Sequence, residues 1–251
     1  MTTPNVQRPY QDAFASLYDR LMSGKKYAAW DALIAEVVRA YSVPTGEALD
    51  VACGTGTISG MLARQGFKPI GIDLSEPMLR EARNKVPSGA FFQADMRDFE
   101  LAGHDSAALA VCFYDSLNYL LTDEDMRATF KCVKRHLAPG GVFLFDMNTR
   151  DHVAASQNNK PRVFDWDDSF VTFRFDGQER IWTMEVDAFA KQADGTYRHT
   201  REWHTERGYD EGDILPLLRD AGFRHLETRV ERKTYENGLE LPSRLYFVAK
   251  A

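Results

Sequence analysis

Short apolar runs alternate with amphipathic segments through the first 150 residues of the chain. The runs have the length and composition of buried strands, and the segments between them have the 3.6-residue period of helices. Strands and helices that alternate in this way form a parallel sheet with helices on both faces. Pro139, Gly140 and Gly141 are expected to end the last intervening helix and to start a strand. The pattern predicts helices at about 11–22 and 26–41, and strands near 47–52, 68–73, 89–94, 107–113 and 141–147.

Beyond residue 161 the period of the pattern changes to two. Between 162 and 205 polar and apolar residues alternate, which is typical of strands with one buried face. The Asp-Gly pairs at 176–177 and 194–195 are turn signals between antiparallel strands. We therefore expect an antiparallel β insertion here. One face of it would include Trp182, Met184, Val186 and Ala188.

The last part of the chain returns to the mixed pattern. It predicts a helix at about 211–221 and two strands near 223–232 and 243–250, which would complete the edge of the first sheet. The expected parts are N-terminal helices with a Rossmann-like core at 1–150, an antiparallel β insertion that forms a substrate lid at 151–206, and a C-terminal helix with two core strands at 207–251.

Composition excludes some classes of function. The 251 residues have a net charge of −6 and a pI of about 5.6, whereas binding to nucleic-acid phosphates requires clustered Lys and Arg. Cys53, Cys112 and Cys132 lack metal-ligand spacing and are expected to be reduced packing residues of a cytoplasmic protein. The apolar stretches are too short to span a membrane. We expect a cytoplasmic monomer or homodimer that binds no nucleic acid, membrane or metal.

The most informative stretch lies at 48–57, where an apolar run that contains Asp50 passes into a glycine-rich turn. Gly54 and Gly56 lack a Cβ, so the backbone can turn sharply and lie close to a ligand. The N–H groups of the following helix would point at an anionic group of that ligand. A dinucleotide cradle would have Gly or Ala where this chain has Ser59. The turn predicts a bound cofactor and leaves a dinucleotide and S-adenosylmethionine (SAM) as alternatives.

Two further acids occupy matching positions on the next two strands. Asp73 ends the apolar run of the second strand, and Asp95 follows the third. A carboxylate at the end of the second strand can accept hydrogen bonds from both hydroxyls of a ribose. The alternative for Asp73 is an N-cap of the next helix, but Ser75 is placed for that role.

With Asp50, Asp73 and Asp95 in this order, the chain resembles the class I SAM-dependent methyltransferases. The resemblance implies a Rossmann-like α/β fold, a mostly parallel seven-stranded sheet with the antiparallel insertion after strand five, and SAM as cofactor. It also implies that Asp73 binds the ribose of SAM, and that Asp95 accepts from the adenine amino group with Met96 against the ring. The other cofactor contacts that it implies are Tyr18, Trp30, Asp50, Ala52, Gly54, Gly56, Leu74, Met78, Phe113 and Asp115.

The N-terminal segments narrow the resemblance. Residues 14–22 and 27–30 are similar to a group of bacterial small-molecule methyltransferases that includes amino-sugar N,N-dimethyltransferases. Tyr18 matches that group's Tyr-Asp pair, whose tyrosine reaches the active site, and Tyr119 stands where some of these enzymes have a histidine. A tyrosine can orient a nucleophile or stabilise a sulfonium through its ring, but it is a weak base at neutral pH.

His204 is the histidine best placed to act as a base. With Arg207 and Tyr209 it matches the His-x-x-Arg-x-Tyr pattern of the same group. A histidine here could take a proton from an amine or hydroxyl nucleophile near neutral pH. The alternative is a structural histidine paired with Glu202 on the same face of the strand.

Methyl transfer from a sulfonium requires mainly the alignment of the acceptor and the exclusion of water. Ligands of open α/β sheets bind beyond the carboxyl ends of the strands, so the insertion is expected to cover the methyl group and to select the acceptor. We predict an enzyme that methylates a nitrogen or oxygen of a small molecule. The alternatives are an RNA or protein methyltransferase, a NAD-dependent dehydrogenase, and a SAM-binding regulatory protein without turnover. The catalytic residues expected in one pocket are Tyr18, Tyr119 and His204.

Overall fold

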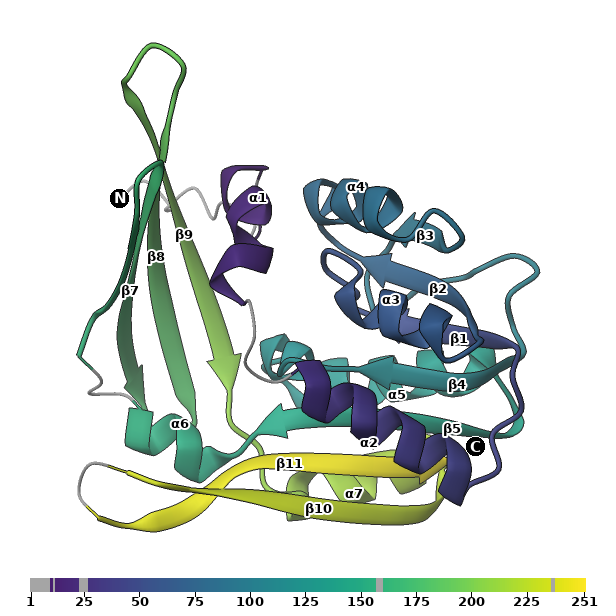
Figure 1. Ribbon diagram of the computed structural model, residues 1–251. Coiled ribbons are helices and arrows are strands. Elements are labelled where there is room, and N and C mark those ends of the chain that lie inside the picture. The colour runs from purple at the N-terminus through teal and green to yellow at the C-terminus, as the bar shows by residue number, and fades with distance from the viewer. Residues whose placement is uncertain (1–9, 11, 23–26, 157–159, 236–237) are drawn as a thin grey trace.

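The computed structural model describes residues 10, 12–22, 27–156, 160–235 and 238–251 of the chain. Its centre is a seven-stranded sheet in the order β10-β11-β5-β4-β1-β2-β3 (Figure 1). The parallel strands are β1 (Glu47–Val51), β2 (Lys68–Asp73), β3 (Ala90–Gln93), β4 (Ala107–Cys112) and β5 (Leu137–Asn148). The antiparallel edge consists of β11 (Glu240–Lys250) and β10 (Arg224–Thr234). The predicted Rossmann-like fold is therefore confirmed.

Helices cover both faces of this sheet. Apolar side chains of α2 (Tyr27–Ala40) and α3 (Thr57–Arg64) pack on one face, and those of α5 (Asp123–His136) and α7 (Glu211–Asp220) pack on the other. Among the described residues, no helix is both long enough and apolar enough to cross a membrane. The remaining helical segments are α1 (Asp12–Leu21), α4 (Glu76–Lys85), the 3₁₀ turn η1 (Ser116–Tyr119) and α6 (Arg150–Ser156).

The alternating segment forms a separate antiparallel sheet after β5, as predicted. Its strands, in spatial as well as chain order, are β6 (Arg162–Trp166), β7 (Ser169–Gln178), β8 (Ile181–Lys191) and β9 (Tyr197–Arg207). Leu17 and Leu21 of α1 pack on its inner face against Val171, Phe173 and Val186. In Figure 1, α1 consequently lies between this sheet and α4 of the core.

The two ends of the inserted segment lie next to each other. Thr149, which follows β5, forms a parallel bridge with Tyr209, which precedes α7. The backbone N–H of Tyr209 also donates to the carbonyl of Asn148, at 3.3 Å. Gly208 permits this contact, because a Cβ there would lie 2.8 Å from the carbonyl oxygen of Thr149. The chain thus leaves the core and returns to it at one point.

Two local predictions were wrong. The Asp176-Gly177 pair is part of β7, and the turn to β8 follows at Glu179, which has a φ of 52°. Gly177 is needed for close strand approach, because a Cβ on it would lie 2.5 Å from the carbonyl oxygen of Ile181. Pro139 to Gly141 also do not end a helix: α5 stops at His136, and these residues form an irregular start of β5. The Asp194-Gly195 pair does join two strands, β8 and β9, as predicted.

Candidate active site

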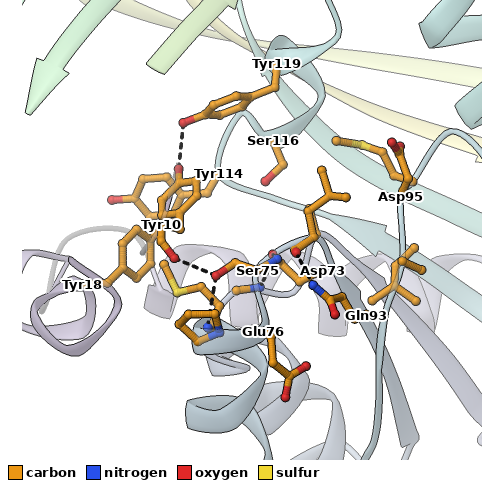
Figure 2. Close-up of a pocket in the computed structure, with 18 of the residues that line it drawn as sticks. Tyr10, Tyr18, Asp73, Ser75, Glu76, Gln93, Asp95, Tyr114, Ser116 and Tyr119 are labelled. Carbon is orange, nitrogen blue, oxygen red and sulfur yellow. Dashed lines mark hydrogen bonds between the residues drawn. The ribbon is translucent and has the colours of Figure 1, made fainter. Parts of the chain in front are cut away.

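A cavity of about 490 Å³ opens at the carboxyl ends of β1, β2 and β3 (Figure 2). This volume is within the usual range of small-molecule sites. The turn after β1, the start of α4, the segment after β3, η1 and the N-terminal segment each contribute residues to its wall. Of the residues predicted from sequence, the wall includes Tyr18, Ala52, Gly54, Asp73, Leu74, Met78, Asp95, Met96 and Tyr119.

The glycine-rich turn is shaped by left-handed backbone conformations. Ala52, Gly54 and Gly56 have φ values of 55°, 53° and 76°, a region that glycine adopts without strain. A Cβ on Gly56 would lie 2.9 Å from the Cβ of Ala82, so glycine is required for the turn to pack against α4. A Cβ on Gly54 would meet no protein atom within 4 Å. Gly54 thus leaves free space beside the cavity.

Two of the three predicted aspartates support this turn. Asp50 is buried below it and accepts a hydrogen bond from the hydroxyl of Ser59 in α3, at 2.6 Å. Burial raises the pKa of Asp50 to about 7, although the hydrogen bond from Ser59 opposes this shift. Asp73 accepts from the backbone N–H groups of Gly54 and Ser75, each at 2.8 Å, one on each carboxylate oxygen. Asp73 therefore joins the end of β2 to the turn and also lines the cavity.

Ser75 caps α4, as predicted from the sequence. Its hydroxyl oxygen accepts from the backbone N–H of Met78 at 3.3 Å. The same hydroxyl donates to the carbonyl of Tyr10 at 2.7 Å, which holds Tyr10 in the cavity wall (Figure 2).

Asp95 lies on the wall opposite Tyr10 and Tyr18 (Figure 2) and forms an ion pair with Arg97. The guanidinium of Arg97 is 2.6 Å from one carboxylate oxygen of Asp95 and also contacts Asp125 at 3.1 Å. Hydrogen bonds from Arg97 lower the pKa of Asp95, so its carboxylate is ionised at neutral pH. An ionised carboxylate beside a cavity accepts hydrogen bonds from a ligand amino group.

A salt-bridged cluster holds α1 over the turn. The ammonium of Lys85 lies 2.6 Å from Asp19, 3.0 Å from the hydroxyl of Thr55 and 2.8 Å from that of Thr57. The Thr55 hydroxyl also donates to Asp19 at 2.5 Å. Asp19 is the second residue of the Tyr-Asp pair noted in the sequence, so this acid joins α1 to the turn.

Tyrosines fill the side of the cavity that faces the inserted sheet. The hydroxyl of Tyr119 lies 2.8 Å from that of Tyr10 and 2.7 Å from Nδ1 of His204, and the ring of Tyr18 packs edge-on against Tyr10 with centroids 5.7 Å apart. Burial raises the pKa of Tyr18 and of Tyr119 well above the usual value, so both phenols are neutral. Tyr18 and Tyr119 line the cavity, and His204 contacts Tyr119 from behind.

Six predicted residues lie outside the cavity wall: Trp30, Asp50, Gly56, Phe113, Asp115 and His204. Trp30 is 1% exposed and packs against Phe113, and its indole N–H has no hydrogen-bond partner among the described residues. Asp115 does not cap η1 through its side chain, because Arg244 binds its carboxylate at 2.8 Å.

Sequence reasoning missed Tyr10 and Arg244. Tyr10 lines the cavity, and Arg244 is buried between Asp115 and Asp146, at 2.8 and 2.6 Å. No local pattern distinguishes either residue, because their partners come from distant parts of the chain.

Comparison with known proteins gives the family. Residues 48–141 match a family model described as a methyltransferase domain. YqeM of Bacillus subtilis (strain 168), which is named as a methyltransferase, is 37% identical over 216 residues, covering 84% of this chain and 85% of YqeM. The chain belongs to the class I SAM-dependent methyltransferases.

Two further matches agree with this assignment. The crystal structure of a SAM-dependent methyltransferase from Clostridium acetobutylicum ATCC 824 has a TM-score of 0.80 and 28% identity, and the match covers 94% of this chain and 97% of that one. A dTDP-3-amino-3,4,6-trideoxy-alpha-D-glucopyranose N,N-dimethyltransferase from Streptomyces venezuelae is 38% identical over 139 residues, or 55% of this chain and 58% of that enzyme. The predictions of an enzyme and of SAM as its cofactor are confirmed.

The residues of this methyltransferase fit its cofactor. Carboxylates that can accept hydrogen bonds from hydroxyl and amino groups stand on two walls of the cavity, at Asp73 and Asp95. Gly54 leaves open the space that a side chain would take. SAM supplies a methyl group that its sulfonium has already activated. The protein must therefore orient an acceptor and exclude water.

Proposed function

We propose that this methyltransferase transfers the methyl group of SAM to a nitrogen or oxygen of a small-molecule acceptor. The main support is the size of the cavity and its lining, in which Tyr18 of α1 takes part and Tyr119 is bonded to His204 of the inserted sheet. A volume of about 490 Å³ accommodates a cofactor with a small acceptor. The Streptomyces venezuelae relative is named for a nucleotide-linked amino sugar, which is a small-molecule acceptor.

In this proposal Asp73 binds the ribose hydroxyls of SAM. Each oxygen of Asp73 accepts one backbone hydrogen bond and keeps a further lone pair for a hydroxyl. Asp95 accepts from the adenine amino group, and Met96 packs on the ring. The indole N–H of Trp30 would donate to the carboxylate of SAM. The other proposed cofactor contacts are Tyr18, Asp50, Ala52, Gly54, Gly56, Leu74, Met78, Phe113 and Asp115, and the proposed catalytic group is Tyr18, Tyr119 and His204.

The proposal also covers partners and location. The net charge of −6 disfavours RNA as the acceptor, and the inserted sheet beside the cavity would obstruct a folded protein. All three cysteines are buried free thiols, which suits the reducing cytoplasm. We place the enzyme there as a monomer or homodimer.

Two measurements test this function. Isothermal titration with SAM, S-adenosylhomocysteine and NAD should show binding of the first two and none of NAD. Transfer of a radiolabelled methyl group from SAM is then followed with a dTDP-linked amino sugar, simple amines, phenols, total RNA and a protein mixture as acceptors. We expect label in a small molecule. Label found only in RNA or protein, or SAM binding with no transfer to any acceptor, would refute the small-molecule proposal.

A further inference from the structure

The inner face of β9 presents a row of buried polar side chains toward the tyrosines. Glu202, His204 and Glu206 are 1%, 1% and 4% exposed, and burial of such groups is costly unless they are hydrogen-bonded. The burial of Glu206 is explained by hydrogen bonds outside the cavity wall, because Glu206 accepts from Trp182 at 3.0 Å and from Asn148 at 3.4 Å. The other two are bonded to residues of the cavity wall.

The hydrogen bonds of this row can all be directed from Tyr10 through Tyr119 to His204. Tyr119 has one hydroxyl proton, and the 2.7 Å contact with Nδ1 of His204 provides an acceptor for it. The hydroxyl of Tyr10 can then donate to the oxygen of Tyr119 at 2.8 Å. With Nδ1 accepting, a neutral imidazole carries its proton on Nε2, which faces Glu202 at 3.5 Å. The same Glu202 oxygen accepts from the backbone N–H of Tyr10 at 2.6 Å.

Tyr119 and His204 lie at different depths from the cavity. Tyr119 is placed to contact the acceptor, and His204 is placed to hold the proton. Tyr119 lines the cavity, where its hydroxyl is reached by another hydroxyl, that of Tyr10 (Figure 2). His204 is 1% exposed and does not line the cavity, and its hydrogen bond to Tyr119 connects it to the cavity wall.

We propose that Tyr119 and His204 form a two-step proton relay for the methyl acceptor, in which Glu202 positions the imidazole. The oxygen of Tyr119 takes the proton of the acceptor, while the hydroxyl proton of Tyr119 passes to Nδ1 of His204. This inference rests on the proposed function, because it requires an acceptor with an N–H or O–H group.

The relay balances in protons and charge. The acceptor N–H or O–H bond breaks and leaves its electron pair on the acceptor, which uses a pair to bind the methyl group. One O–H bond of Tyr119 breaks as another forms, so the phenol stays neutral, which its raised pKa requires. Nδ1 of His204 gains the proton, and Glu202 stabilises the resulting imidazolium. After product release the proton returns through Tyr119 to water.

The first test needs no acceptor. Long-range proton–nitrogen NMR spectra of ¹⁵N-histidine-labelled enzyme in alkaline buffer report which ring nitrogen of His204 carries the proton. We expect the proton on Nε2, and we expect the Nδ1 resonance to shift in Tyr119→Phe. A proton on Nδ1 would overturn the relay, since that nitrogen could not accept from Tyr119.

The second test separates proton transfer from structure. In His204→Asn the side-chain oxygen can still accept from Tyr119 but cannot take its proton. We expect kcat to fall by about 10²–10⁴-fold, as for loss of a positioned base, with the Kd of SAM and the KM of the acceptor little changed. Tyr119→Phe should behave alike. Imidazole added to His204→Gly should restore part of the rate.

Matched controls are His136→Asn and Tyr246→Phe. The side chain of His136 is hydrogen-bonded to the carbonyl of Cys132, and that of Tyr246 is hydrogen-bonded to Glu231, both away from the cavity. Both should keep the wild-type kcat. Wild-type kcat in His204→Asn, or a change in KM alone, would overturn the relay. A wild-type enzyme that binds SAM but methylates no small molecule would instead refute the proposed function, and the NMR result would still decide the hydrogen-bond direction.

Discussion

Replacement of Asp73 by asparagine should weaken SAM binding with little change in side-chain shape. The two carboxylate oxygens accept from Gly54 and Ser75 at 2.8 Å each. An asparagine is uncharged and has one acceptor oxygen in place of two, so one ribose hydroxyl loses its hydrogen bond to a charged group. Such a bond contributes about 1.5–3 kcal/mol, which corresponds to a Kd roughly 10- to 150-fold higher. Isothermal titration with SAM measures this change.

The control for Asp73→Asn is Asp194→Asn. Asp194 also accepts from a backbone N–H, that of Thr196 at 2.9 Å, but it lies in the turn between β8 and β9. This variant should bind SAM as the wild type does. Urea unfolding without ligand shows whether each variant is folded. An unchanged Kd in folded Asp73→Asn would show that Asp73 only organises the backbone and does not bind the ribose.

Three further predictions concern the turn. Gly56→Ala should lower the free energy of unfolding by about 2–4 kcal/mol in urea titrations, from left-handed strain together with the 2.9 Å contact with Ala82; wild-type stability would contradict this. Gly54→Ala should lose only about 1–2 kcal/mol of stability, because space is free there, but its SAM affinity should fall; unchanged affinity would place the cofactor elsewhere. Burial raises the pKa of Asp50 from 3.8 to about 7, so its favourable contribution is present below the unfolded pKa and is lost as pH rises through about 7. Asp50→Asn should remove a pH dependence of unfolding on the order of 4 kcal/mol, and equal pH slopes for both proteins would refute it.

Local sequence patterns predicted most of the fold because strands and helices differ in their apolar period. The exceptions show where such patterns are insufficient. Asp176-Gly177 has the composition of a turn, but the contact that requires Gly177 is with the carbonyl of Ile181 on the next strand. A glycine needed for a turn and one needed for close strand approach look alike in a single sequence.

In the candidate site, residues with a local sequence signal were predicted, and residues defined by distant partners were missed. Asp73 and Asp95 were predicted because the first ends a strand and the second follows the next strand closely, and both line the cavity. Tyr10 was missed because its partners Ser75, Tyr119 and Glu202 lie 65, 109 and 192 residues further along the chain. The role of Asp115 depends likewise on Arg244, 129 residues later.

The bridge between Thr149 and Tyr209 makes the inserted sheet a unit that is joined to the core at a single place. Its entry and exit share one point on the core, so a longer, shorter or foreign segment can be joined there without moving β5 or α7. The closure entropy of such a segment changes by only about 0.6 kcal/mol for each doubling of its length. A chimaera joined at these two residues would keep the strands of the core and would test whether the inserted segment selects the acceptor.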